Sequence, residues 1–147
     1  MLFKFLKYLQ PTYYFSLTRK QKGSIFPRVE DLPEDVLNHL NNDSHYVSEA
    51  ASNYELSWQA IQKGYIGDVS TYETFEQLSL VDEYRFIRKS FHPIWVFYVL
   101  LIRLFSLKNP FQEIRAYLKT RRVRRLDYGK NTITYPNYEN FHSSLIQ

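Results

Sequence analysis

The chain has 147 residues, the length of one small domain. Its hydrophobic content of 44% is ordinary for a globular core and argues against wholesale disorder. It contains no Cys, which excludes disulfides and thiolate metal sites.

The net charge of +4 is the balance of large blocks of opposite sign. Residues 1–28 carry six Lys or Arg and no acid, residues 29–84 carry twelve acids against one Lys, and residues 85–130 carry twelve Lys or Arg against two acids. The pattern predicts four regions: 1–28, a basic segment with a short amphipathic helix; 29–91, an acidic helical region; 92–126, an apolar helix and a basic amphipathic helix; 127–147, an irregular tail.

A short amphipathic helix is expected at Leu2–Leu9. Its Leu and Phe side chains gather on one side, Lys4 and Lys7 lie near the other, and Pro11 ends it. Two interpretations stay open, an interfacial membrane anchor and a helix folded onto the domain. The two lysines interrupt what would be the apolar core of a secretory signal, so we expect the chain to stay on the cytoplasmic side of a membrane.

The acidic region is expected to begin with a helix near Asp31. Glu34 follows three residues later, which is a capping-box spacing, and Asn41–Asp43 ends the helix. The acids of this region predict a solvated surface. The alternative is a face that docks the chain's own basic block or a basic partner.

Two longer helices follow in the same region. Ser44 is expected to cap the first, whose apolar residues recur at three- and four-residue steps until Gly64 stops it. The second is expected to begin near Ser70, with Glu73 as another capping box, and to end before Pro93, because a residue before Pro avoids the helical region.

Ile94–Leu107 is apolar except for Arg103 and Ser106. Its 14 residues span about 21 Å at about 1.5 Å per residue, less than the roughly 30 Å of a hydrocarbon core. A helix that is apolar all round is buried in protein or in lipid, and both interpretations remain open. Arg103 would have to snorkel to the surface or pair with a carboxylate. A buried Trp95 would remove the main argument for lipid.

Asn109-Pro110 separates this helix from a second one, predicted at Phe111–Arg125, which is rich in Arg and Lys. The pair is typical of a monotopic hairpin, with Trp95 and Tyr98 near the lipid boundary and the basic helix among the headgroups. The candidate membrane- or anion-binding residues are Lys4, Lys7, Trp95, Tyr98, Arg103, Arg115, Lys119, Arg121, Arg122, Arg124 and Arg125.

The basic run at 119–125 also suits nucleic-acid phosphates. No nucleic-acid-binding signature accompanies it, and the acidic region would repel a polyanion, so we do not expect a nucleic-acid partner. The four histidines have no metal-binding spacing. No phosphate-binding loop or nucleophile motif occurs. We therefore predict no metal and no cofactor.

One resemblance is carried by residues 92–125, HPIWVFYVLLIRLFSLKNPFQEIRAYLKTRRVRR. This segment looks like the hydrophobic and basic tails that follow the catalytic domain in some bacterial cell-surface glycosyltransferases. The chain lacks the D-x-D metal motif of that family, so no functional residue carries over. The resemblance implies an accessory piece without catalytic machinery, in envelope polysaccharide assembly.

Together these patterns predict a mainly helical domain of about five or six helices with an irregular aromatic C-terminal tail, which includes a short strand at Thr132–Tyr135. The function that they favour is non-catalytic: peripheral attachment to the cytoplasmic face of a membrane, or to a membrane complex. Two alternatives stay open. One is an enzyme or glycosyltransferase fragment that acts on a phosphate-bearing substrate. The other is a soluble helical subunit that binds a protein partner through Ile94–Leu107.

Overall fold

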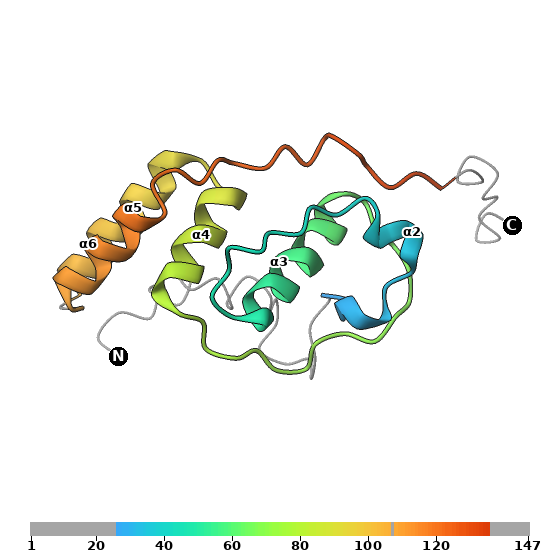
Figure 1. Ribbon diagram of the computed structural model, residues 1–147, viewed down its shortest axis with the longest axis horizontal. Coiled ribbons are helices and arrows are strands. Elements are labelled where there is room, and N and C mark those ends of the chain that lie inside the picture. Colours follow the sequence, from blue (N-terminus) through green and yellow to red (C-terminus); the bar gives the residue numbers. More distant parts are fainter. Residues whose placement is uncertain (1–25, 107, 136–147) are drawn as a thin grey trace, which may run out of the picture.

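A computed structural model of the protein describes residues 26–106 and 108–135 (Figure 1). This part of the chain is mainly helical, as expected, with five α-helices, one 3-10 turn and no strand. Lys4, Lys7 and the predicted helix Leu2–Leu9 lie outside the described residues. The elements are η2 (Val29–Asp31), α2 (Glu34–Leu37), α3 (Glu49–Gln62), α4 (Leu80–Ser90), α5 (Pro93–Phe105) and α6 (Pro110–Lys119).

The expected helix start at Asp31 is wrong. Asp31 ends the 3-10 turn η2, and the four-residue helix α2 begins after Pro33 without a side-chain cap. The Asp31 carboxylate instead accepts a hydrogen bond from the hydroxyl of Ser70. This contact joins the turn to the segment before α4.

The cap of helix α3 lies four residues after the expected one, because Ser48 and not Ser44 caps the helix. The Ser48 hydroxyl accepts from the backbone N–H of Ala51 at 3.2 Å. The carboxylate of Asp82 accepts from the N–H of Val47 at 2.8 Å, which fixes the chain before the helix to α4. Gly64 follows the end of α3 as expected, with φ of 95°, a conformation that favours glycine.

Helix α4 begins at Leu80, capped by Ser79, and not near Ser70. Residues 70–79 are irregular, and their aromatic residues pack on α3. The rings of Tyr72 and Phe75 lie edge-on to Tyr54 at 5.2 and 5.1 Å. The Tyr54 hydroxyl also accepts from the N–H of Glu76 at 2.9 Å. Packing against α3 therefore replaces the helix that the capping-box spacing predicts.

The main core lies between α3 and the three helices α4, α5 and α6, which pack against one another. Tyr84, Phe86 and Ile87 of α4 and Val96 and Val99 of α5 are almost completely buried. A second, smaller cluster joins α2 to the end of α3 and consists of Leu32, Val36, Ala60 and Tyr65.

Helix α6 ends at Lys119, not at Arg125. Thr120 follows as its C-cap, and the guanidinium of Arg88 donates to the Tyr117 carbonyl and to the Thr120 hydroxyl, each at 3.1 Å. The helix therefore ends where the Arg88 side chain donates to one of its last carbonyls.

Residues 120–135, the return segment, then run back along the molecule without regular structure (Figure 1). The N–H of Leu126 donates to the Lys89 carbonyl, and the N–H of Ile133 donates to the Lys63 carbonyl, both at 2.9 Å. The strand expected at Thr132–Tyr135 is therefore wrong. These residues belong to an irregular segment that connects α4 to the end of α3.

Candidate functional site

Helix α5 has one face in the core and one face exposed. His92 caps it by accepting from the N–H of Ile94 at 3.3 Å, and Pro93 occupies its first turn. Its buried residues, Val96, Val99, Leu100 and Arg103, recur at three- and four-residue steps, so they lie on one face of the helix. The apolar residues on the other side remain uncovered: Ile94 is 73% exposed, Phe97 51% and Phe105 82%.

The two aromatic residues predicted near a lipid boundary lie on this exposed side. Trp95 is 37% exposed and Tyr98 47%, and their ring centroids are 5.4 Å apart. The sequence left a core helix and a lipid-facing helix as alternatives. In the structure one stripe of α5 packs in the core, and the other side of the helix is exposed.

Arg103 requires a correction, because it does not reach the surface. Its guanidinium lies 2.5 Å from a carboxylate oxygen of Glu83 on α4 and 3.5 Å from one of Glu113 on α6. The Tyr84 hydroxyl donates to the Glu113 carboxylate at 2.8 Å. Of the two ways to accommodate Arg103, pairing with carboxylates is the one observed, and we remove Arg103 from the candidate contact residues.

This buried cluster holds the three helices together. Burial raises the pKa of Glu83, while the Arg103 guanidinium opposes that rise. Burial and the hydrogen bond to Glu113 raise the pKa of Tyr84. Because two carboxylates share one guanidinium, the cluster serves the packing of α4, α5 and α6 and leaves no positive charge for an external ligand.

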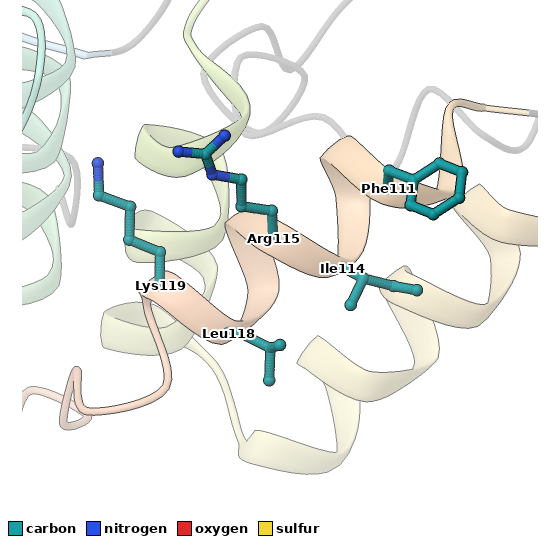
Figure 2. A pocket seen from close by; sticks show the side chains of 5 residues that line it. All are labelled: Phe111, Ile114, Arg115, Leu118 and Lys119. Carbon is teal, nitrogen blue, oxygen red and sulfur yellow. The ribbon is translucent and has the colours of Figure 1, made fainter.

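Helix α6 also divides into two faces. Glu113, Ala116 and Thr120 face inward, and Phe111 at 85%, Leu118 at 55% and Ile114 at 42% are exposed. A shallow groove of about 560 Å³ lies on the outer side, lined by Phe111, Ile114, Arg115, Leu118 and Lys119. Figure 2 shows Arg115 and Lys119 extending to one side of the helix and Ile114 and Leu118 to the other.

The remaining predicted basic residues follow α6 directly. Arg121, Arg122, Arg124 and Arg125 begin the return segment, and all four are exposed, as are Arg115 and Lys119. Within residues 26–106 and 108–135, none of these six cations forms an ion pair. The structure thus brings unpaired positive charge next to the exposed apolar residues of α6.

A second buried charge cluster was not singled out from the sequence. Lys89 of α4 lies 2.8 Å from Glu55 of α3 and 3.2 Å from Asp43, and Arg85 lies 2.8 Å from Asp43. Burial raises the pKa of Glu55, which Lys89 opposes. The signal in the sequence that could have indicated this cluster is Glu55, because a charged residue beside the apolar stripe of a helix needs a partner when it is buried. These charges compensate one another, so the cluster joins helices.

A separate polar hollow of about 550 Å³ lies where η2, α3 and residues 70–76 meet. Its one cation, Arg28, lies 3.7 Å from Glu30, and Glu73 and Glu76 also line it. The basic residues of α6 and of the return segment do not line it, so they form no part of this hollow.

Two features are absent from residues 26–106 and 108–135. No group of His, Asp and Glu side chains there could hold a metal ion, and no helix there is long and apolar enough to cross a bilayer. Comparison of the chain with protein-family models, with curated proteins and with solved structures found no match.

Proposed function

We propose that the protein attaches to the surface of an anionic membrane, on its cytoplasmic side, through the outer faces of α5 and α6. The observation that carries this proposal is the coincidence of two features. Phe105 and Phe111 are more than four-fifths exposed at the end of α5 and the start of α6. On and just after α6 lie six exposed cations that form no ion pair within the described part of the chain.

The two features contribute comparable free energies. Full burial of a Phe or Leu side chain stabilises by about 1.5–3 kcal/mol, and a basic residue near an anionic leaflet contributes about 1 kcal/mol at physiological salt. Peripheral attachment relies on several such terms at once. We therefore expect attachment to need anionic lipid, to need the apolar residues, and to weaken at high salt.

Another protein chain could also cover the exposed face of α5, as the alternative of a helical interaction subunit implies. The centre of a protein interface is depleted of charged residues, whereas here cations of one sign adjoin the apolar residues. This excess of positive charge favours an anionic surface. The proposal includes a role in envelope polysaccharide assembly. That part of it rests only on the resemblance of residues 92–125 to the tails of cell-surface glycosyltransferases.

Vesicle flotation tests the proposal. The full chain is mixed with vesicles of phosphatidylcholine alone or of phosphatidylcholine with phosphatidylglycerol, and we expect recovery only with the anionic vesicles. The variant Phe105→Ser/Phe111→Ser should lose most of that recovery. Val47→Ser/Ile66→Ser is the matched control, because both residues are 66% exposed apolar side chains outside α5 and α6.

Charge is tested in the same assay. Arg121→Gln/Arg122→Gln should reduce recovery, and Lys130→Gln, at an exposed cation farther along the return segment, should reduce it less. Equal recovery with neutral and anionic vesicles, or no recovery with either, would overturn the proposal. If the lipid-free protein instead self-associates through the two phenylalanines, the face belongs to a protein interface.

A further inference from the structure

We propose that α6 binds a single anionic amphiphile, with its phosphate held by Arg115 and Lys119 and its hydrocarbon chain along the apolar side of the same helix. This inference rests on the proposed membrane attachment and deepens it. The α6 groove would select a lipid whose headgroup carries a phosphate and no cation that competes with Arg115 and Lys119 for that phosphate.

The spacing of the two cations suits one phosphate group. Arg115 and Lys119 are four residues apart on one helix, so they lie on the same side with about 5–6 Å between their Cβ atoms. The planar guanidinium of Arg offers two parallel donors to a phosphate, and Lys adds a point charge. Charge-assisted hydrogen bonds of this kind are shorter and stronger than neutral ones.

The apolar side chains form a row beside this pair. Phe111, Ile114 and Leu118 are spaced by three and four residues, and together they cover about 10 Å of the helix at about 1.5 Å per residue. They line the same groove of about 560 Å³ as the two cations. Figure 2 shows Ile114 and Leu118 on one side of α6 and the two cations on the other, which matches a ligand with one apolar part and one anionic part.

Both cations are exposed, and the described part of the chain does not neutralise either of them. The basic residues nearer the core are neutralised inside the protein, Lys89 by Glu55 and Arg103 by Glu83. Glu113, the one acid of α6, points inward and accepts from Tyr84, so it does not compete for Arg115 or Lys119. Within the described residues no carboxylate pairs with either cation.

Charge also decides between the possible occupants of the groove. The α6 surface of a second copy of this chain would carry the same unpaired cations, so its approach would bring like charges together. An anionic lipid complements both halves of the groove. We therefore assign the groove to lipid and make self-association an outcome of the test.

The test uses soluble, monomeric ligands with the full chain. Isothermal titration measures the affinity for dihexanoyl phosphatidic acid below its critical micelle concentration. Two comparison ligands separate the contributions of the phosphate and of the acyl chains. Dihexanoyl phosphatidylcholine has the same chains, but its choline cation balances the phosphate charge. Inorganic phosphate has no chain. We expect phosphatidic acid to bind about tenfold more tightly than either. Arg115→Gln/Lys119→Gln should abolish this preference. Arg28→Gln/Lys130→Gln removes equal charge at two exposed cations outside the groove and should keep it.

Several results would overturn the inference. Equal affinity for phosphatidylcholine means that no headgroup is recognised, and equal affinity for inorganic phosphate means that no chain is bound. Loss of the preference in the Arg28/Lys130 variant means that net charge alone acts. Sedimentation velocity of lipid-free protein gives a further criterion: a dimer that Leu118→Ser dissociates places a second copy in the groove.

The inference and the proposed function can fail separately. If anionic vesicles float the protein but no monomeric lipid shows the preference, membrane attachment stands and the α6 site falls. If phosphatidic acid shows the preference but no vesicle floats the protein, the site stands as a lipid-binding groove and membrane attachment falls. Urea unfolding midpoints of each variant establish that a lost signal is not lost fold.

Discussion

Lys89 of α4 and Glu55 of α3 form a buried ion pair, with Nζ and Oε2 2.8 Å apart. The pair joins the basic half of the sequence to the acidic half, and Arg85 with Asp43 and Arg103 with Glu83 do the same. The basic block is thereby divided. Arg85, Lys89 and Arg103 pair with acids inside the protein, whereas the Arg and Lys residues from Arg115 to Arg125 are exposed.

Replacing Lys89 with Met should destabilise the protein strongly, because it leaves the Glu55 carboxylate buried without its cation. Removing one partner of a buried pair costs about 3–5 kcal/mol. The double variant Lys89→Met/Glu55→Met should recover much of that loss. Urea unfolding followed by circular dichroism measures both, and a single variant as stable as the parent protein would contradict the pairing.

Asp43 makes stability depend on pH in the acid range. Burial would raise its pKa, but hydrogen bonds from His45 and the charge of Lys89 outweigh burial and hold the pKa well below the ordinary 3.8. A carboxyl with a lowered folded pKa contributes stability above its unfolded pKa and loses it as the pH falls below that value. Asp43→Asn should therefore be less stable than the parent at pH 6, and the difference should shrink below about pH 3.8. Urea midpoints that differ by the same amount at pH 6 and pH 3 would contradict this.

The stability loss of Arg103→Met should also grow as the pH rises, but over a higher pH range than that of Asp43→Asn. The substitution leaves Glu83 and Glu113 buried together, at a cost of about 3–5 kcal/mol near neutral pH. Burial already raises the pKa of Glu83, and loss of the guanidinium raises it further. Ionisation of a carboxyl with a raised folded pKa lowers stability as the pH rises from about 4.5. The variant should thus be relatively less impaired at pH 5 than at pH 8. A pH-independent loss would show that Arg103 acts only through packing.

The helix caps allow a test of whether α3 begins where the structure places it or where the sequence pattern predicts it. Ser48→Ala and Ser79→Ala should each cost about 1 kcal/mol, because each hydroxyl accepts from a backbone N–H in the first turn of its helix. Ser44→Ala, at the cap expected from sequence, should change stability by less than about 0.5 kcal/mol. Thermal unfolding compares the three, and a larger loss for Ser44 than for Ser48 would favour the earlier helix start.

The fold class and the breaks around α5 were predictable because they depend on local chemistry. His92-Pro93 and Asn109-Pro110 set the starts of α5 and α6 in the structure through the fixed backbone of proline and a capping side chain. The caps of α3 and α4 were misplaced, because several Ser residues match a capping pattern. The choice among them depends on tertiary contacts such as Asp82 with the N–H of Val47.

The candidate surface was predictable only in part. An apolar sequence such as that of α5 does not indicate which side packs in the core, and the structure decides this through the stripe that includes Val96 and Val99. The pairing of Arg103 depends on Glu83 and Glu113, which lie on two other helices and have no sequence relation to it. The end of α6 at Lys119 depends on Arg88 in the same way.

Trp95 reports directly on the proposed entry of the exposed side of α5 into an anionic bilayer, because it is itself 37% exposed there. Tryptophan fluorescence of the full chain is measured with phosphatidylglycerol-containing vesicles whose acyl chains are brominated, which quench only a tryptophan that contacts them. We predict quenching with these vesicles that persists in Trp58→Phe and disappears in Trp95→Phe. Emission unchanged by the brominated anionic vesicles, or quenched equally by brominated phosphatidylcholine alone, would show that α5 does not enter an anionic bilayer in this way.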